Sequence, residues 1–366
     1  MVELYESVPN FSEGRDILVR GELVRAAQKA YWLDEDADPD HNRTVVTLAG
    51  PRPKLMDALL AAVAEAVEKI DIRRHRGVHP RTGAADVIPI VPLGRTSLES
   101  CRDLAHEVAH RIWEELKVPV FYYGHGESKR LVDIRSGRAT PDVGGPLLHP
   151  TAGGACVGAR PALVAFNVIL YDTDLVTARA LARTVRETSS GGLRGVQALV
   201  FQLTGGRVQL SMNLFRLDET KPDDVIAELE RRGASLGAQE VVGLCPALAA
   251  NAAADGRVLE GRLAAVAAGR ASRRAEELAD GEHRALARRL RETSGALTRV
   301  GAGQDAFLAA AEQSAALIPV LRAGGVLDDD AEALLDAAAR GFRAAISTAT
   351  AALYRARVEA LDARLA

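Results

Sequence analysis

Strand-like and helix-like segments follow one another in the same order twice along this chain. Short apolar runs bounded by glycine and proline predict strands, and apolar residues three and four apart predict helices. Both runs give the order strand, helix, strand, strand, helix, strand, which is that of a ferredoxin-like unit. The first run is Val2–Val8, Arg15–Lys29, Tyr31–Asp36, Arg43–Ala49, Pro51–Ile70 and Ala85–Leu93, and the second is Ala162–Tyr171, Leu175–Thr188, Val196–Leu203, Arg207–Phe215, Pro222–Arg232 and Glu240–Leu244.

We therefore predict an α+β fold of two ferredoxin-like (βαββαβ) α/β subdomains that form a cleft, followed by an all-helical C-terminal segment. A helix at Ser97–Leu116 and a strand at Val118–Tyr123 extend the first run. The predicted domains are residues 1–158, 159–256 and 257–366.

Composition changes near residue 257. Glycine and proline interrupt the chain regularly before that point, but afterwards Pro319 is the only proline and aromatic residues are sparse, which predicts helix throughout. An apolar stripe with spacings of three and four must pack against another surface, so we expect an antiparallel bundle or a dimer contact. The stripe consists of Leu335, Ala339, Phe342, Ile346, Ala349 and Leu353.

The charge balance excludes some classes of partner. The 46 lysines and arginines nearly balance the 49 acidic residues, and the net charge of −3 argues against binding nucleic acid or a membrane surface through bulk charge. No apolar run reaches the roughly 18 residues of a membrane span, and the N-terminus does not resemble a signal peptide. The three cysteines lie far apart and form no CxxC pair, which predicts reduced thiols and a cytoplasmic protein.

The segment between the two runs, residues 135–160, is rich in glycine and proline. Loops of this length inside a compact domain are usually functional or disordered. We predict a functional loop, and the alternative is a flexible linker between domains.

The densest group of reactive side chains lies just before the last strand of the first run. Residues 75–81 read HRGVHPR, with two imidazoles among guanidiniums. Gly77 and Pro80 exclude a helix, so the two histidines do not form an i,i+4 metal pair. Neighbouring positive charge favours a neutral imidazole, as a general base requires, and arginines suit the carboxylates of a substrate. The alternative is a solvated basic loop.

A second polar group lies at the facing ends of the second and third strands. It consists of Asp34-Glu35-Asp36 and Asn42-Arg43-Thr44. Carboxylates at such a position can orient an imidazole or bind a cationic substrate. The alternative is an ordinary polar hairpin.

Several of these segments also occur, in the same order, in a known family. They are VPNFSEGR at residues 8–15, NRTV at 42–45, RH-x-G-x-HPR-x-GA at 74–84, DV at 86–87, GAR at 158–160, AFN at 165–167 and VGL at 242–244. Over about residues 3–255 the sequence resembles the glutamate formimidoyltransferase (formiminotransferase) family, as in the N-terminal domain of formimidoyltransferase-cyclodeaminase.

The resemblance implies two α/β subdomains with a substrate tunnel, and transfer of a formimino group from N-formimino-L-glutamate to N5 of tetrahydrofolate. This reaction belongs to histidine degradation and one-carbon metabolism. Tetrahydrofolate is the co-substrate, and no metal is expected. The implied partners are these small molecules and a second copy of the chain in a homodimer, with neither nucleic acid nor a membrane.

The resemblance also assigns roles to individual residues. His79 is implied to be the general base, and Asp36 the carboxylate that supports it. The residues implied to bind the donor are Asn42, Arg43, Arg81 and Arg160. The loop implied to bind folate is Gly144, Gly145, Pro146, Leu147, Leu148, His149, Pro150, Thr151, Ala152 and Gly153.

Some positions depart from the family pattern. Ala152 stands where the family has an aromatic residue, and Pro161 where it usually has lysine. The helical segment lacks the Gly-rich signature of the animal cyclodeaminase. Alternatives with the same fold are another formimino or formyl donor, or a folate-binding protein without catalysis.

A remote alternative is a zinc hydrolase, because residues 106–110 read HEVAH, which matches H-E-x-x-H. His106 and His110 fall on the polar face of the predicted helix, which indicates a solvent-facing position rather than a metal site.

Overall fold

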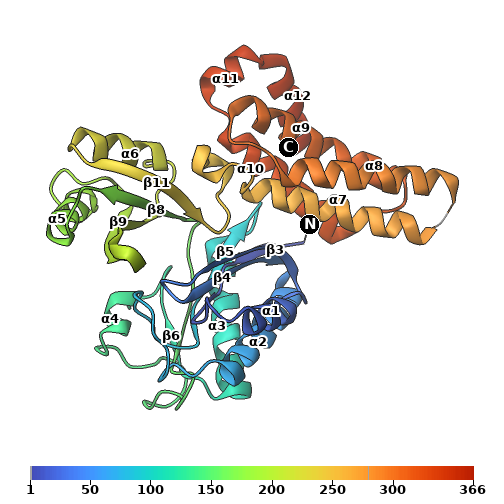
Figure 1. Ribbon diagram of the computed structural model, residues 1–366. Helices are drawn as coiled ribbons and strands as arrows, with labels where there is room; N and C mark the ends of the chain where they lie inside the picture. Colours follow the sequence, from blue (N-terminus) through green and yellow to red (C-terminus); the bar gives the residue numbers. More distant parts are fainter. Residues whose placement is uncertain (1, 279) are drawn as a thin grey trace. The chain divides into compact units, whose positions relative to one another are not determined.

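The structure is a computed structural model, and it describes residues 2–278 and 280–366 (Figure 1). The chain is a mixed α and β protein with two sheets and a helical C-terminal region, as predicted. It divides into two compact units. The first unit comprises Glu3–Ala162 and Phe201–Arg207, and the second comprises Val2, Leu163–Val200 and Val208–Ala366.

The sheet of the first unit is mixed, with both antiparallel and parallel strand pairs. β1 and β2 both pair with β4 and with β5, so together they fill one position between those strands. β3 pairs with the far side of β4, and the pairing of β5, β7 and β6 is parallel. The strands are β1 (Leu4–Ser7), β2 (Asn10–Phe11), β3 (Tyr31–Asp38), β4 (Arg43–Gly50), β5 (Ala85–Leu93), β6 (Val120–Tyr122) and β7 (Ala155–Ala159).

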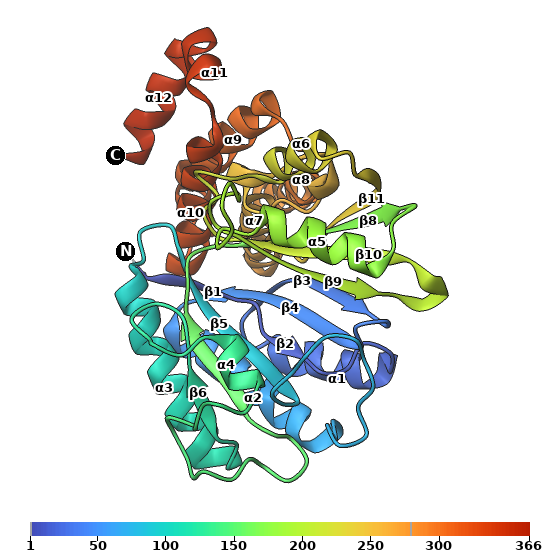
Figure 2. The ribbon, with the colours of Figure 1, turned by 90° about the vertical axis from the view of Figure 1, so that its left-hand side faces the viewer.

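Three helices cover one face of this sheet (Figure 2). They are α1 (Ile17–Ala27), α2 (Arg52–Lys69) and α3 (Leu98–Leu116). Apolar residues at helical spacing form their inner sides, for example Leu55, Leu59 and Val63 of α2, which are fully buried. The Ser97 side chain accepts a hydrogen bond from the Ser100 amide and begins α3. The apolar core of the first unit therefore lies between these helices and one side of the sheet.

Part of the segment 135–160 is regular structure, which corrects the prediction that it is a loop throughout. Its last residues form β7, a buried strand between β5 and β6, and α4 (Leu131–Arg135) precedes the segment. β7 consists of small residues behind two glycines, and this composition gives little strand signal. The two parallel neighbours stabilise it as a strand, and they are distant in sequence.

The sheet of the second unit has the order β11-β8-β10-β9, and β8 pairs antiparallel with both β10 and β11. In chain order the elements are strand, helix, two strands, helix and strand. The last strand begins earlier than the predicted Glu240–Leu244. The elements are β8 (Val164–Tyr171), α5 (Leu175–Val185), β9 (Val196–Gln202), β10 (Val208–Leu214), α6 (Pro222–Arg231) and β11 (Ser235–Val242), with short 3-10 turns at Thr204–Gly206, Ala247–Ala249 and Ala252–Ala254.

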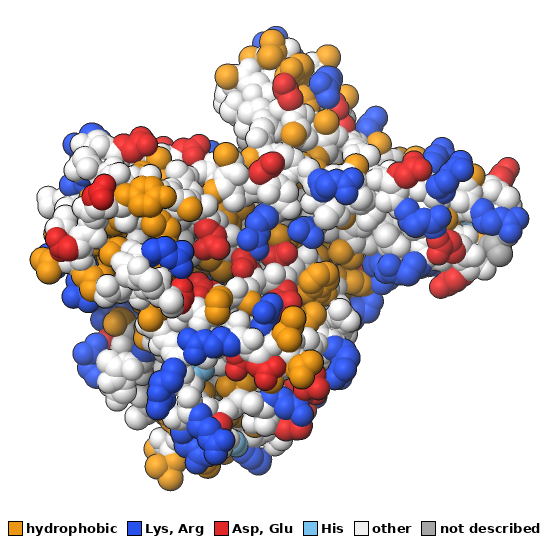
Figure 3. Space-filling model, viewed as in Figure 1, with side chains coloured by type: hydrophobic (Ala, Val, Ile, Leu, Met, Phe, Trp, Pro, Cys, Tyr) orange, Lys and Arg blue, Asp and Glu red, His pale blue; other side chains and the backbone are white. Residues whose placement is uncertain are grey.

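The helical region belongs to the second unit. α7 (Leu259–Leu278) and α8 (Gly281–Thr298) form a hairpin, and α10 (Asp329–Ala345) packs against α7 and α9 (Gln304–Ala323). Figure 3 shows Lys and Arg side chains gathered along the α7–α8 hairpin. The final helices are α11 (Thr348–Leu353) and α12 (Arg355–Leu365).

The predicted apolar stripe is continuous only in its first part. Leu335, Ala339 and Phe342 are buried on α10, whereas the helix ends at Ala345 and Leu353 is 74% exposed. The Ser347 side chain accepts from the Thr350 amide and begins a new helix, which redirects the chain.

α9 is, among the described residues, the helix long and apolar enough to cross a membrane by length and composition. Its apolar side chains Phe307, Leu308 and Leu321 are buried against neighbouring helices, which is the usual position of a core helix.

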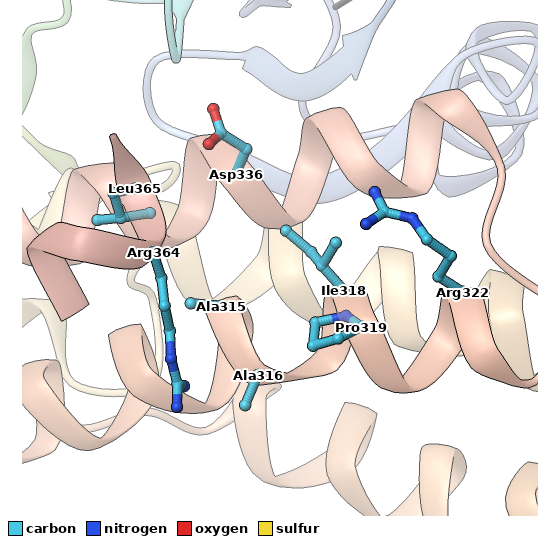
Figure 4. A pocket seen from close by; sticks show the side chains of 8 residues that line it. All are labelled: Ala315, Ala316, Ile318, Pro319, Arg322, Asp336, Arg364 and Leu365. Atoms are coloured by element: carbon cyan, nitrogen blue, oxygen red, sulfur yellow. The ribbon is translucent and has the colours of Figure 1, made fainter. Parts of the chain in front are cut away.

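A hollow of about 510 Å³ lies where α9, α10 and α12 meet. Ala315, Pro319 and Leu365 contribute its apolar wall, and Figure 4 shows Arg322 and Arg364 at opposite ends. None of the residues predicted to carry chemistry lines this hollow.

We predict that Gly83→Ala destabilises the fold. A Cβ at Gly83 would lie 2.2 Å from the Gly154 carbonyl oxygen and 2.4 Å from that of Ala152, and backbone cannot easily move away. The free energy of unfolding, measured by urea denaturation, should fall by about 1–3 kcal/mol. The control is Gly21→Ala in α1, where nothing lies within 4 Å, and it should gain about 0.5–1 kcal/mol. Equal stability of the two variants would contradict the prediction.

Candidate active site

The face of the first sheet that points away from the helices is apolar around Val87, Phe121 and Cys156 and polar over β1, β3 and β4, and this second part is called the polar face below. On β4, Val46 and Leu48 point into the helix-covered core, so the alternate residues Arg43 and Thr47 point to the opposite side. Asp36 lies opposite Val45 and shares that side. Thr47 is buried, and its Oγ1 atom has no hydrogen-bond partner within the described part of the chain. Buried polar atoms of this kind are typical of a surface that binds a ligand.

His79 lies on the loop before β5 and points toward Arg43. Its Nδ1 lies 2.7 Å from the Pro80 carbonyl oxygen, an acceptor, and also 2.7 Å from Arg43 Nη1, a donor. Arg43 Nη1 is in addition 3.0 Å from Nε2, so one guanidinium nitrogen contacts both nitrogens of the ring. The Phe201 ring, which belongs to the same unit, has its centroid 5.7 Å from that of the His79 ring. These contacts hold the imidazole beside Arg43.

The surroundings of His79 favour its neutral form. Burial, followed by the positive charges of Arg43 and Arg135, holds the pKa of His79 far below its usual range. Burial also lowers the pKa of Arg43 to about 10, and the charge of Asp86 opposes that shift. An imidazole in this position is neutral and can accept a proton directly. The neutral form is the protonation state predicted from the sequence.

Arg43 is held by two side chains as well as by His79. Its Nε donates to Asn10 Oδ1 at 2.8 Å, and its Nη1 lies 3.8 Å from Asp86 Oδ2. Asp86 also pairs with Arg135 at 2.7 Å. Arg135, on α4, has a buried Nε with no partner among the described residues. Arg43 therefore contacts the imidazole, Arg135 is joined to Arg43 through Asp86, and Arg135 Nε keeps a free donor among the described residues.

The rest of the 75–81 loop supports this arrangement. Arg81 contacts the His75 ring, and its Nη2 donates to the His79 carbonyl at 2.6 Å. A Cβ on Gly77 would lie 2.3 Å from the His41 carbonyl oxygen, so only glycine allows the loop to pack so closely. The structure thus brings Arg43 and Arg81 to His79, as predicted from the motif.

Asn42 has a structural position in the same region. Its Oδ1 accepts from the Gly14 amide at 2.8 Å, and its Nδ2 donates to the Arg76 carbonyl at 3.1 Å. Its own carbonyl lies 2.9 Å from His75 Nε2. The φ of 48° at Asn42 is in the left-handed region, which asparagine tolerates better than most residues. Asn42 therefore joins the start of β4 to the histidine loop.

The loop 144–153 is attached to the residues that follow His79. The Ala84 amide donates to the Ala152 carbonyl at 2.8 Å, and the Ile72 amide donates to the Thr151 carbonyl at 2.9 Å. His149 and Gly153 exchange two backbone hydrogen bonds and close the end of the loop. Leu147 at the tip is 83% exposed.

Arg160 lies with two further titratable groups on the polar face. Burial raises the pKa of Glu6 on β1 to about 7, and the nearby charge of Arg160 opposes that shift. Burial likewise raises the pKa of Tyr123 to about 12, again opposed by Arg160. Arg160 is therefore a half-buried cation near a carboxyl group whose pKa is raised to about 7.

The residues of the zinc motif have other contacts. His106 Nε2 lies 2.9 Å from Glu127 Oε1, and its ring stacks on Tyr122 at 4.1 Å. His110 Nε2 lies 3.4 Å from the Tyr122 hydroxyl. Within residues 2–278 and 280–366, no group of three or more His, Cys, Asp and Glu side chains could hold a metal ion.

Sequence reasoning did not single out several residues of this face. Asn10, Asp86 and Arg135 contact the His79–Arg43 pair or one another, and Glu6 lies beside Arg160. An acidic residue inside an otherwise apolar strand pattern, as at Glu6 and Asp86, is the signal that could have indicated them.

Comparison with known proteins shows the family of this chain. A family model described as "Formiminotransferase domain, N-terminal subdomain" matches residues 4–160. Glutamate formimidoyltransferase from Streptococcus pyogenes serotype M1 is 35% identical over 273 residues, which cover 68% of this chain and 91% of the relative. The protein of the same name from Thermoplasma acidophilum is 36% identical over 271 residues, or 67% and 89%. The chain belongs to the formiminotransferase family.

Formimidoyltransferase-cyclodeaminase from Gallus gallus is 36% identical over 275 residues, which cover 67% of this chain and 51% of that protein. All the site residues predicted from the sequence, from Asp36 to Arg160, lie within the segment matched by the family model.

We predict that stability declines with pH because of Glu6. Its pKa rises from 4.5 to about 7 on folding, so the folded protein binds the proton more tightly than the unfolded chain between these values. The free energy of unfolding should therefore fall by about 3 kcal/mol as pH rises from 4.5 through 7. Glu6→Gln should remove this decline in urea unfolding at pH 5 and pH 8. The control is exposed Glu68→Gln, and an unchanged decline in Glu6→Gln would refute the assignment.

Proposed function

We propose that the protein transfers the formimino group of N-formimino-L-glutamate to N5 of tetrahydrofolate. The observation that carries the proposal is the His79 imidazole, which contacts Arg43 and which burial, together with the charges of Arg43 and Arg135, keeps neutral on the polar face of the sheet. Membership of the formiminotransferase family, with relatives named glutamate formimidoyltransferase, supports the reaction type.

The proposed mechanism needs one base and no covalent enzyme intermediate. N5 of tetrahydrofolate attacks the formimino carbon, and the new bond leaves a positive charge on N5. Nε2 of His79 accepts the proton from N5, and the charge disappears. The bond from carbon to the glutamate nitrogen then breaks, and the imidazolium returns its proton to that nitrogen. Holding both substrates in one site supplies much of the acceleration.

Charged residues around His79 have complementary roles in this proposal. The glutamate carboxylates of the donor and of folate require cations, and Arg43, Arg81 and Arg160 are the proposed ones. Asp36 is proposed to stabilise the imidazolium that forms after proton transfer. Its place on the same side of the sheet as Arg43 supports this role.

Residues 144–153 are proposed to bind tetrahydrofolate. The backbone bonds from this loop to residues 82–84 and to Ile72 support the proposal, because they fix it to the segment that follows the base. The exposed leucine at position 147 offers apolar surface for a pteridine ring.

The larger architecture is proposed to be a duplication. Two ferredoxin-like halves, residues 1–158 and 159–256, would be followed by the helical segment 257–366. The strand order β11-β8-β10-β9 with two intervening helices supports the second half.

We predict that His79→Ala lowers kcat for formimino transfer by about 10²–10⁴-fold, because the proton on N5 loses its acceptor. A spectroscopic assay of the folate product with N-formimino-L-glutamate measures this rate. His110→Ala is the control, since His110 contacts the Tyr122 hydroxyl and should retain full activity.

The outcomes of this assay separate the alternatives. Equal product from wild type and His79→Ala would contradict the mechanism. Binding of tetrahydrofolate without product in wild type would exclude this donor and favour a different formimino or formyl donor.

We predict that Leu147→Asp weakens binding of tetrahydrofolate at least tenfold. The substitution replaces the apolar surface proposed to contact the pteridine ring with a hydrated carboxylate, which would lose its water when the ring binds. Isothermal titration calorimetry gives the dissociation constant. The matched control is Leu353→Asp, a similarly exposed leucine on α11, which should bind like wild type. The same affinity in both variants would show that the loop tip does not contact folate.

A further inference from the structure

Asp86 is an extra residue in the sheet of the first unit. Asn10 of β2 lies opposite Val87, whereas the next residue, Phe11, lies opposite Ala85, so Asp86 has no partner across the ladder. A bulge of this kind turns the side chain away from the direction that strand alternation would give it. The carboxylate is 2% exposed. The bulge therefore interrupts the regular strand pairing at a residue that carries a buried carboxylate.

Three separate elements provide partners for this carboxylate. The Thr82 amide donates to Oδ1 at 2.6 Å, and Arg135 Nη2 donates to Oδ2 at 2.7 Å. Arg43 Nη1 lies 3.8 Å from Oδ2. These partners come from the loop that follows His79, from α4 and from β4. A buried charge without such partners is strongly unfavourable, so the three elements are held together.

The positive charges of the same two guanidiniums act on the His79 ring. Arg43 lies within 3.0 Å of its Nε2, and the charge of Arg135 also acts on it. His41 faces the ring from the turn before β4, with ring centroids 5.8 Å apart, and Arg81 binds the His79 carbonyl. Among the groups that face His79 here, Asp86 is the one that contacts both Arg43 and Arg135.

We propose that Asp86 is a positioning residue, which holds Arg43 and Arg135 against His79 and leaves Arg135 Nε available to a carboxylate of the substrate. Asp86 itself makes no contact with the reacting atoms in this proposal. The effect of Asp86 on catalysis rests on the proposed function. The position of the guanidiniums, however, can be tested independently of turnover.

The first test follows the ionisation of His79 by NMR. The ring of wild type should stay neutral between pH 5 and pH 8. In Asp86→Asn the Arg135 guanidinium loses its anchor and moves away, whereas Arg43 keeps its hydrogen bond to Asn10. The pKa of His79 should therefore rise above that of wild type, although burial still holds it below its usual range. If Asp86 acted only as a nearby negative charge, its loss would lower that pKa further. A pKa of His79 in Asp86→Asn equal to or below that of wild type would overturn the proposal.

The second test separates positioning from stability. Misplaced guanidiniums should lower kcat/KM for the donor on the order of 100-fold in Asp86→Asn, with both a higher KM and a lower kcat. Asp86→Glu keeps the charge and should recover part of this loss. The matched control is Asp336→Asn, which removes a buried carboxylate paired with Arg340 in the other unit and should lower only the melting temperature. Kinetics of Asp86→Asn equal to those of the control would refute the proposal.

Two further results are possible: Asp86→Asn does not fold, or the wild type has no transferase activity. If Asp86→Asn does not fold, Arg135→Gln removes one guanidinium and should raise the pKa of His79 in the same direction. No shift in that folded variant would contradict the proposal. If wild type has no transferase activity, the proposed function fails, whereas the NMR titrations still decide the role of Asp86.

Discussion

A buried carboxylate that binds two guanidiniums is the interaction on which the candidate active site depends. Asp86 is withdrawn from water by the bulge between β2 and β5, so its charge must be compensated locally. Arg135, Arg43 and the Thr82 amide supply that compensation. This carboxylate therefore joins α4, the start of β4 and the loop that follows His79.

Close backbone contact provides the second constraint. Gly83 lies so near residues 152–154 that a side chain would collide with backbone oxygens. The two segments are also joined by hydrogen bonds from Ala84 to Ala152 and from Gly154 to Thr82. The loop proposed to bind folate and the loop that carries the proposed base are therefore joined directly, as a reaction between two bound substrates requires.

Burial acts on the ionisable groups of the polar face in a consistent direction. It lowers the pKa of His79 and raises that of Glu6, so each group is driven toward its neutral form. The arginines oppose this trend at Glu6 and strengthen it at His79. The near-zero net charge of the whole chain gives no indication of this local arrangement, because it averages over a surface where charges are screened.

Local patterns in the sequence were sufficient for much of the fold and for part of the site. The apolar run Ala85–Leu93 is a strand with the predicted bounds, because every residue in it is buried or nearly so. Arginines beside His79 indicated a neutral imidazole, and the structure confirms their proximity. These features depend on residues close in sequence, for which periodicity and composition are informative.

Other features were decided only by tertiary structure. β7 is a strand because β5 and β6 pair with it on both sides, although its own residues are small. Asp86, Arg135 and Glu6 become site residues because a bulge, a short helix and the burial of one sheet face bring them to His79 and Arg160. The sequence by itself determined the family and the main strands and helices, and it indicated His79 as the candidate base. The partners of that base were fixed by long-range packing, since a buried charge selects its partner by distance in space and not along the chain.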